Sequence, residues 1–120
     1  MIVLRRKGTL IQFGAAAGDA PAAFPWAPFP DLLAIDTALR GWVRESLGLK
    51  PIRIHERFVE RPDPEGAIYY LVETGGALAA PDIPLQWLDA GQAARLLARA
   101  DRAALARAMR YLAGAAARPG

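Results

Sequence analysis

Apolar residues recur along the chain at two spacings. The shorter one, in which every second residue is apolar, predicts strands. Residues 52–59 alternate between apolar and polar side chains, which is typical of a strand with one buried face. Residues 67–72 form a continuous apolar run, which favours a central strand that ends at Thr74-Gly75-Gly76. A turn is predicted over residues 61–66, so this strand is expected to form a hairpin with residues 52–59. A Lys7-Gly8 turn separates two shorter apolar runs near the N-terminus. The predicted strands are residues 2–4, 9–13, 52–59, 67–72 and 85–88.

The longer spacing, of three and four residues, predicts an amphipathic helix in the first half of the chain. Asp31 is placed to cap its N-terminus, and Gly48 is a natural stop at its C-terminus. Polar residues fall largely outside the apolar stripe, so one face of the helix is expected to be buried. The stripe consists of Leu32, Ile35, Leu39, Trp42, Val43 and Leu47.

Two further helices are predicted near the C-terminus. Asp89 and Gln92 have the spacing of a capping box, which favours a helix over residues 90–98. Asp101 is expected to cap a last helix that runs to about Leu112, with a frayed tail over residues 114–120. This alanine-rich helix also offers a surface for a second copy of the chain. Its expected buried residues are Leu105, Ala108, Met109 and Leu112.

Residues 14–30 are rich in alanine, glycine and proline, and they predict a long loop. The end of this loop carries Phe24, Trp26 and Phe29, whose rings we expect to pack on the domain or to line a cleft. The order of elements favours a single domain over residues 1–120, of the α/β (α+β) class. We expect a mixed β-sheet with helices on both faces.

Composition narrows the class of protein. A chain of 120 residues suits one domain with one core, and the absence of cysteine excludes disulfides and thiolate metal sites. No apolar run reaches the length of about eighteen residues that a membrane span needs, and no signal peptide is evident, so a cytoplasmic protein is expected. The net charge is +3, and the basic residues include one cluster over residues 5–7 and a second, of arginines, over residues 95–110. Because no aromatic residues alternate with those arginines, we favour a solvated helix face over a nucleic-acid site.

The order of these elements and several local sequences resemble the Nudix hydrolase superfamily over nearly the whole chain. Residues 1–6 and 9–13 are similar to its opening strands, and Trp26 with its neighbouring prolines is similar to the segment before the Nudix box. Residues 44–49 resemble the end of that box. Residues 68–73 resemble the central strand that follows. The motif Gln86-Trp87-Leu88-Asp89 resembles the closing strand.

The resemblance also shows where the box departs from its pattern, G-x5-E-x7-R-E-U-x-E-E-x-G-U, in which U is a bulky aliphatic residue. When Gly48 is placed on the last glycine, Glu45 falls on the first glutamate of the E-E pair and Ser46 on the second. Trp42 falls on the glutamate of the R-E pair, and Gly41 on its arginine. The alignment therefore predicts a degenerate box with one retained carboxylate.

This loss bears on the chemistry, because hydrolysis of a diphosphate bond relies on divalent cations, and Mg²⁺ needs several oxygen ligands. Glu45 alone offers one charged ligand, and we expect it to be a solvated carboxylate or an arginine partner rather than a metal ligand. Other carboxylates could take part if the fold brings them together, although pairing with arginine is the favoured interpretation. These candidates are Asp36, Glu56, Glu60 and Glu73.

His55, the single histidine, lies on the charged face of its predicted strand and is expected at the surface. The leading hypothesis for function is a module without hydrolase activity that needs no cofactor. It would bind a nucleotide-like small molecule or a protein partner. The alternative is a divergent Mg²⁺-dependent hydrolase of nucleoside diphosphate compounds, and a basic protein associated with nucleic acid is the third hypothesis. The candidate ligand-binding residues are Trp26, Phe29, Arg44 and Glu45, with Glu45 also the candidate metal ligand.

Overall fold

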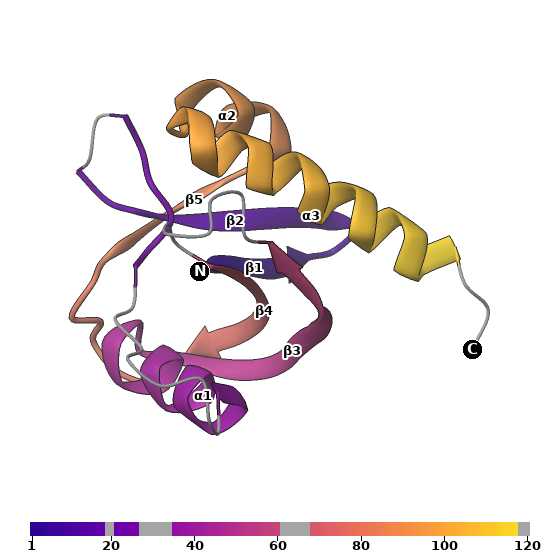
Figure 1. Cartoon of the computed structure of the whole chain (residues 1–120). Coiled ribbons are helices and arrows are strands. Elements are labelled where there is room, and N and C mark those ends of the chain that lie inside the picture. The colour runs from indigo at the N-terminus through magenta and orange to yellow at the C-terminus, as the bar shows by residue number, and fades with distance from the viewer. Residues whose placement is uncertain (19–20, 27–34, 61–67, 118–120) are drawn as a thin grey trace.

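The computed structural model describes residues 1–18, 21–26, 35–60 and 68–117, which form five strands and three helices (Figure 1). Residues 19–20, 27–34, 61–67 and 118–120, and the side chains of residues 56, 59, 60 and 115–117, lie outside the description. The strands are β1 (Ile2–Lys7), β2 (Leu10–Ala16), β3 (Leu49–Glu60), β4 (Tyr69–Ala77) and β5 (Leu85–Leu88). The helices are α1 (Ile35–Ser46), α2 (Ala90–Leu96) and α3 (Arg99–Ala117).

The five strands form one mixed sheet in the order β3-β4-β1-β2-β5. β1 pairs with β2 in antiparallel orientation and with β4 in parallel orientation, so the first strand of the chain is the middle strand of the sheet. β3 and β4 pair in antiparallel orientation, as the hairpin prediction required. The prediction of a mixed sheet is therefore confirmed.

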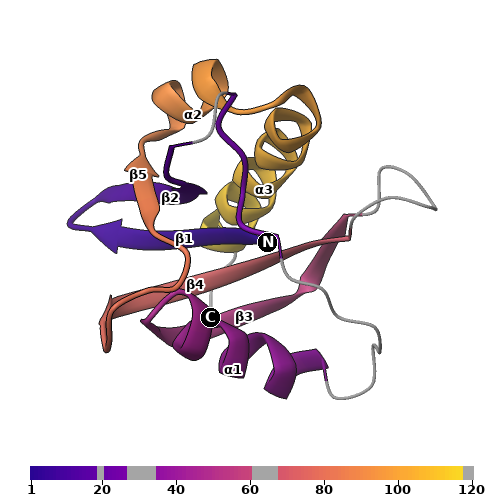
Figure 2. The same cartoon turned by 90° about the vertical axis from the view of Figure 1, so that its left-hand side faces the viewer.

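Helices cover both faces of this sheet, with α1 on one face and α2 and α3 on the other (Figure 2). Alternate residues of β1 explain why both faces are apolar. Ile2 and Leu4 pack in the cluster with α2 and α3, whereas Val3 packs in the cluster with α1. All three side chains are fully buried, which is what a strand covered on both faces requires.

The apolar stripe of α1 lies against the sheet as its spacing predicted. Leu39 and Val43 are buried, and Trp42 is partly buried at the edge of the same cluster. Gly48 follows the helix with a φ of 63°, a conformation that favours glycine. A Cβ on Gly48 would overlap the carbonyl oxygen of Ala79, so the chain passes another segment closely at this point.

Three strands run well past their predicted ends. β1 runs on through Lys7, and β2 continues through Ala16, so the expected loop over residues 14–30 begins later than Gly14. β4 does not end at the glycines of residues 74–76 but continues to Ala77. Pairing with a neighbouring strand explains each extension, because Gly14 to Ala16 pair with β5 and Ala77 pairs with Leu49 of β3. These pairings outweigh the low strand propensity of glycine.

The C-terminal helices confirm one predicted cap and correct another. The capping box of Asp89 and Gln92 is present at the start of α2. Asp101 does not cap α3 but lies in its first turn, where its carboxylate accepts hydrogen bonds from the Phe24 backbone N–H (2.9 Å) and the Tyr69 hydroxyl (2.6 Å). Burial and this hydrogen bond raise the pKa of Tyr69. Met109, expected in the core, is 42% exposed.

Several predictions fall outside the described residues. The cap at Asp31, the ring of Phe29 and the turn over residues 61–66 belong to these segments. Of the tail predicted to fray, residues 114–117 continue α3, and residues 118–120 are not described. Within the described part of the chain, no helix combines the length and apolar character that crossing a membrane demands.

Candidate functional site

The helix that resembles the box, α1, presents its retained carboxylate to solvent. Glu45 and its neighbour Arg44 are both exposed, on the face of α1 opposite the buried stripe. The main-chain carbonyl oxygen of Ser46 accepts hydrogen bonds from the N–H groups of Asp82 (2.9 Å) and Ile83 (3.0 Å), which fixes the end of the helix against that segment. Trp42, where the box would have a glutamate, packs partly against the sheet.

The other candidate carboxylates do not gather around Glu45. Asp36 accepts a hydrogen bond from Arg40 one turn later on α1 (3.0 Å), which is an ordinary surface pair. Glu73 on β4 pairs with Arg6 on β1 (2.9 Å). The side chains of Glu56 and Glu60 lie outside the description. Among the side chains that the structure describes, no three histidine, aspartate or glutamate residues are grouped as a metal site requires.

The aromatic residues before α1 differ from one another in burial. Phe24 is 7% exposed and belongs to the core beneath α2 and α3. Trp26 is 67% exposed, so its ring stands free of that core. Phe29 lies outside the described residues. The expectation that the rings pack on the domain therefore holds for Phe24 and not for Trp26.

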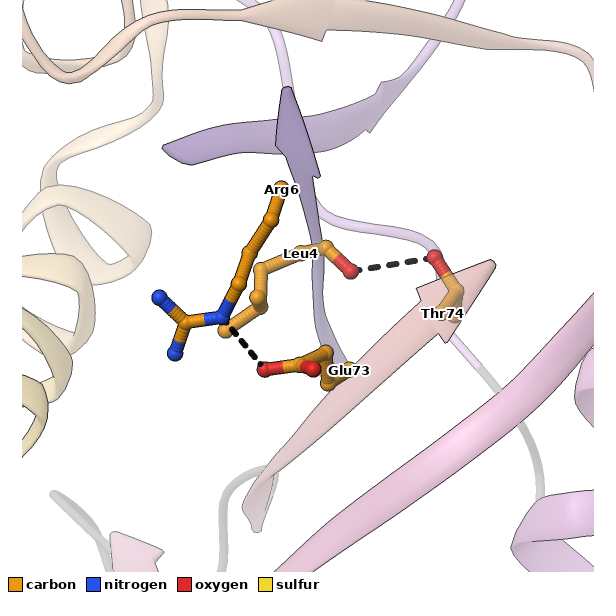
Figure 3. A network of polar contacts seen from close by, with 4 residues as sticks. All are labelled: Leu4, Arg6, Glu73 and Thr74. Atoms are coloured by element: carbon orange, nitrogen blue, oxygen red, sulfur yellow. Dashed lines mark hydrogen bonds and ion pairs between the residues drawn. The ribbon is translucent and has the colours of Figure 1, made fainter. Parts of the chain in front are cut away.

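A second feature of chemical interest lies where β1 and β4 separate. The two parallel strands are paired from Ile2 to Leu4 on β1, with Glu73 as the last partner on β4. Beyond this point β1 continues with β2, and β4 continues with β3. The hydroxyl of Thr74 donates a hydrogen bond to the carbonyl oxygen of Leu4 (3.0 Å) and closes the base of the resulting fork (Figure 3). The fork is the opening between residues 5–7 of β1 and residues 74–76 of β4.

A hollow of about 390 Å³ opens in this fork. Positive charge exceeds negative charge along the hollow, because the described side chains of its wall include three cations and one carboxylate. Arg5 is already engaged, since it bonds to Gln12 (2.8 Å) and lies 4.2 Å from the ring centre of Trp87. Lys7 is exposed, and Glu73 contacts Arg6 through a single nitrogen, Nε. The wall residues are Arg5, Arg6, Lys7, Ile52, Glu73, Thr74, Gly75 and Gly76.

His55 corrects the prediction of a surface histidine. It is 3% exposed, and its ring meets the ring of Tyr111 on α3 edge to face at 5.5 Å. Neither ring nitrogen has a hydrogen-bond partner in the described structure. Burial and the positive charge of Arg53 lower the pKa of His55, while Glu73 opposes this effect. The reason for the error is that α3 covers the face of β3 that carries His55, whereas Ile54, one residue earlier, packs in the cluster with α1 on the other face.

Sequence reasoning did not find the fork. The cluster of residues 5–7 was visible as a basic run, but its interpretation as a solvated surface gave no reason to connect it with residues 73–76. The two segments meet through parallel pairing, which joins residues that are far apart in the chain. The glycines at 75 and 76 were a signal of close backbone approach, although they were interpreted as a strand end.

Comparison with known proteins gives one informative likeness. No family model matches the sequence, and no curated protein matches it. Among solved structures, a crystal structure of a C. elegans Ap4A hydrolase binary complex is similar, with a TM-score of 0.62 and 20% sequence identity. The match covers 94% of this chain and 96% of that chain. That hydrolase is a Nudix enzyme. At this identity the likeness concerns the fold, and the chain has a Nudix-like fold.

Proposed function

We propose that this chain is a binding module with a Nudix-like fold that has lost the metal chemistry of the box and holds a nucleotide-like ligand without hydrolysing it. The observation that carries the proposal is the isolation of Glu45. It is exposed, it belongs to no metal-ligating group among the described side chains, and Trp42 and Ser46 occupy the neighbouring box positions.

The described side chains around Glu45 do not fit Mg²⁺. This ion needs near-octahedral coordination by oxygen atoms, and it releases its bound water reluctantly. One exposed carboxylate cannot compete well with that water, and a tryptophan supplies no oxygen ligand. We therefore propose that the module needs no metal cofactor, and that Glu45 is a solvated carboxylate.

A ligand could still be held beside α1 by groups that need no metal. The exposed indole of Trp26 is free to stack on a base, and the exposed guanidinium of Arg44 is free to pair with a phosphate. Stacking contributes roughly 1–3 kcal/mol per base, and an arginine–phosphate contact adds geometric specificity. In this proposal Phe29 adds a second ring, and Glu45 orients Arg44 or a ligand hydroxyl.

The test separates ligand binding from catalysis. Adenosine diphosphate is titrated into the protein while tryptophan fluorescence is followed, and the same mixture with Mn²⁺ or Mg²⁺ is examined by ³¹P NMR for cleavage. We expect saturable quenching that is lost in Trp26→Ala, and no cleavage product above the rate without protein. Trp87→Phe is the matched control: Trp87 lies on β5 beneath Arg5, so its loss should leave the part of the quenching that depends on Trp26.

The alternative function is a divergent hydrolase of nucleoside diphosphate compounds, and the likeness of the fold to an Ap4A hydrolase favours it. It predicts cleavage that depends on a divalent cation and is lost in Glu45→Gln. Calorimetric titration with Mn²⁺ gives a second measure. Micromolar affinity that disappears in Glu45→Gln, but persists in the paired-carboxylate control Asp36→Asn, would replace the binding-module proposal with this one.

A further inference from the structure

We infer that the fork between β1 and β4 is an anion-binding site that takes a phosphate or diphosphate group. No residue of α1 lines the hollow, so this inference is independent of the proposed ligand site beside that helix. The site is built from the Arg6–Glu73 ion pair, the exposed Lys7 and a glycine-rich strand edge.

The first argument is the unused capacity of Arg6. A guanidinium carries five N–H donors, and the contact with Glu73 uses Nε alone. Figure 3 shows the two terminal nitrogens directed away from Glu73, and half of the Arg6 side chain is exposed, at 52%. Arg6 is therefore oriented by Glu73 and still has the planar pair of terminal nitrogens with which arginine binds phosphate oxygens.

The second argument is the balance of charge. Lys7 is exposed on the same wall, and Glu73 is the single carboxylate among the described side chains that line it. Arg53, which pairs with Glu73 across β3 and β4, adds a further exposed cation near the hollow. A concave surface with an excess of one charge concentrates counter-ions of the opposite charge. An anion is therefore the favoured occupant.

The third argument is the backbone of the fork. The carbonyl of Leu4 faces β4, because Thr74 donates to it. Residues two apart in a strand direct their backbone groups to the same side, so the N–H of Arg6 also faces the fork beyond the last paired residues. On the opposite wall Gly75 and Gly76 carry no side chain, and a Cβ on Gly76 would meet nothing within 4 Å. An oxyanion can therefore approach the backbone closely.

The experiment is a titration of the ¹⁵N-labelled protein with inorganic pyrophosphate, followed by ¹H–¹⁵N NMR. We expect saturable shifts of the amide signals of Lys7, Gly75 and Gly76 at low-millimolar concentrations or below. The apparent affinity should fall as salt is added, since the contacts are partly exposed charges. The spectra also report whether each variant is folded.

Two variants with opposite expected effects make the test sharp. Lys7→Gln removes a cation and should weaken binding roughly five- to tenfold, whereas Arg95→Gln on α2 changes the net charge equally and should leave the affinity unchanged. Glu73→Gln keeps an acceptor for Arg6 Nε but removes the competing negative charge. It should tighten binding several-fold, an effect that loss of a merely structural residue would not produce.

Titrations with adenosine diphosphate and with adenosine show whether the fork binds the phosphate group alone or a whole nucleotide. Shifts at the fork with pyrophosphate and the diphosphate, but not with adenosine, support a site for the phosphate group itself. A nucleoside diphosphate that binds at least tenfold more tightly than pyrophosphate supports a site for the whole nucleotide. An absence of shifts at residues 7, 75 and 76, or equal weakening by Arg95→Gln, overturns the inference. So does tighter binding of Mg²⁺ than of pyrophosphate at the fork.

Discussion

Replacing His55 by phenylalanine should stabilise the protein, although most substitutions in a core are destabilising. A neutral imidazole has one donor and one acceptor nitrogen, and in the described structure both are buried without a partner. Each unpaired buried polar group costs about 1–3 kcal/mol. The slightly larger phenyl ring adds some crowding, so we expect a net gain of about 1–3 kcal/mol in the free energy of unfolding for His55→Phe.

The surroundings of His55 are suited to an aromatic ring. Tyr111 lies edge to face with it at an interplanar angle of 85°, and Tyr111 also meets the ring of Phe58 at 5.6 Å. A phenyl ring at residue 55 can keep the edge-to-face geometry, which contributes about 0.5–1.5 kcal/mol per pair. Urea unfolding measures the effect, and a gain of 2 kcal/mol corresponds to a rise of about 1 M in the midpoint.

The pH dependence provides a second, independent measure. Because the pKa of His55 is lowered in the folded protein, the unfolded chain binds a proton more readily than the folded one. The stability of the parent protein should therefore fall as the pH drops below about 6.5, the usual value for histidine. The phenylalanine variant lacks this group, so its advantage should grow between about pH 7.5 and pH 5.5. Arg53→Gln should reduce the sensitivity of the parent to acid, since Arg53 helps to lower the pKa.

Two results would refute this reasoning. If His55→Phe lowers the urea midpoint at neutral pH, the ring nitrogens of His55 make stabilising hydrogen bonds in the folded protein, which contradicts the reasoning. If the difference between variant and parent does not change with pH, the imidazole takes up protons equally in the folded and unfolded chains. His55→Leu provides the comparison, because it removes the polar atoms and also the edge-to-face contact.

Three further substitutions test the fold. Gly48→Ala should cost about 1–3 kcal/mol or more from the positive φ, and the overlap with the Ala79 carbonyl adds to this cost, as thermal unfolding would show. Tyr69→Phe should cost about 1.5–3 kcal/mol in urea unfolding, because it removes a hydrogen bond to the Asp101 carboxylate. Trp42→Ala should cost about 2–3 kcal/mol, less than the 3–5 kcal/mol of a fully buried tryptophan, and an unchanged melting temperature would mean that the ring does not pack on the sheet.

The elements that could be predicted from sequence are those whose signals are local. The capping box of Asp89 and Gln92 needs only its own four residues, and it is present. The stripe of α1 needs only a repeating spacing, and Leu39 and Val43 are buried as it predicted. The order of strands and helices then limited the fold to a mixed sheet covered on both faces, which the structure confirms.

The features that were missed depend on contacts between distant segments. The low strand propensity of Gly75 and Gly76 predicts that the strand ends there, yet β4 continues to Ala77 because it pairs with β3. His55 lies on the charged face by simple alternation, yet Tyr111 of α3 covers it there and buries it. The position of Asp101 in the sequence predicts a helix cap, but its carboxylate accepts a hydrogen bond from the Tyr69 hydroxyl instead. In each case a partner from another part of the chain decides the outcome, and periodicity contains no information about that partner.

The difference between the two faces of α1 explains why the fold can be recognised from the sequence when the activity cannot. α1 stabilises the sheet through its apolar face, on which Leu39 and Val43 are buried, and any sequence that keeps this face keeps the fold. Glu45, the candidate metal ligand, stands on the exposed face, where substitution costs little stability. A carboxylate at such an exposed position can thus be replaced without unfolding the helix. A likeness in fold at 20% identity therefore reports on the buried face, and only measurements on Glu45 and its neighbours report on the chemistry.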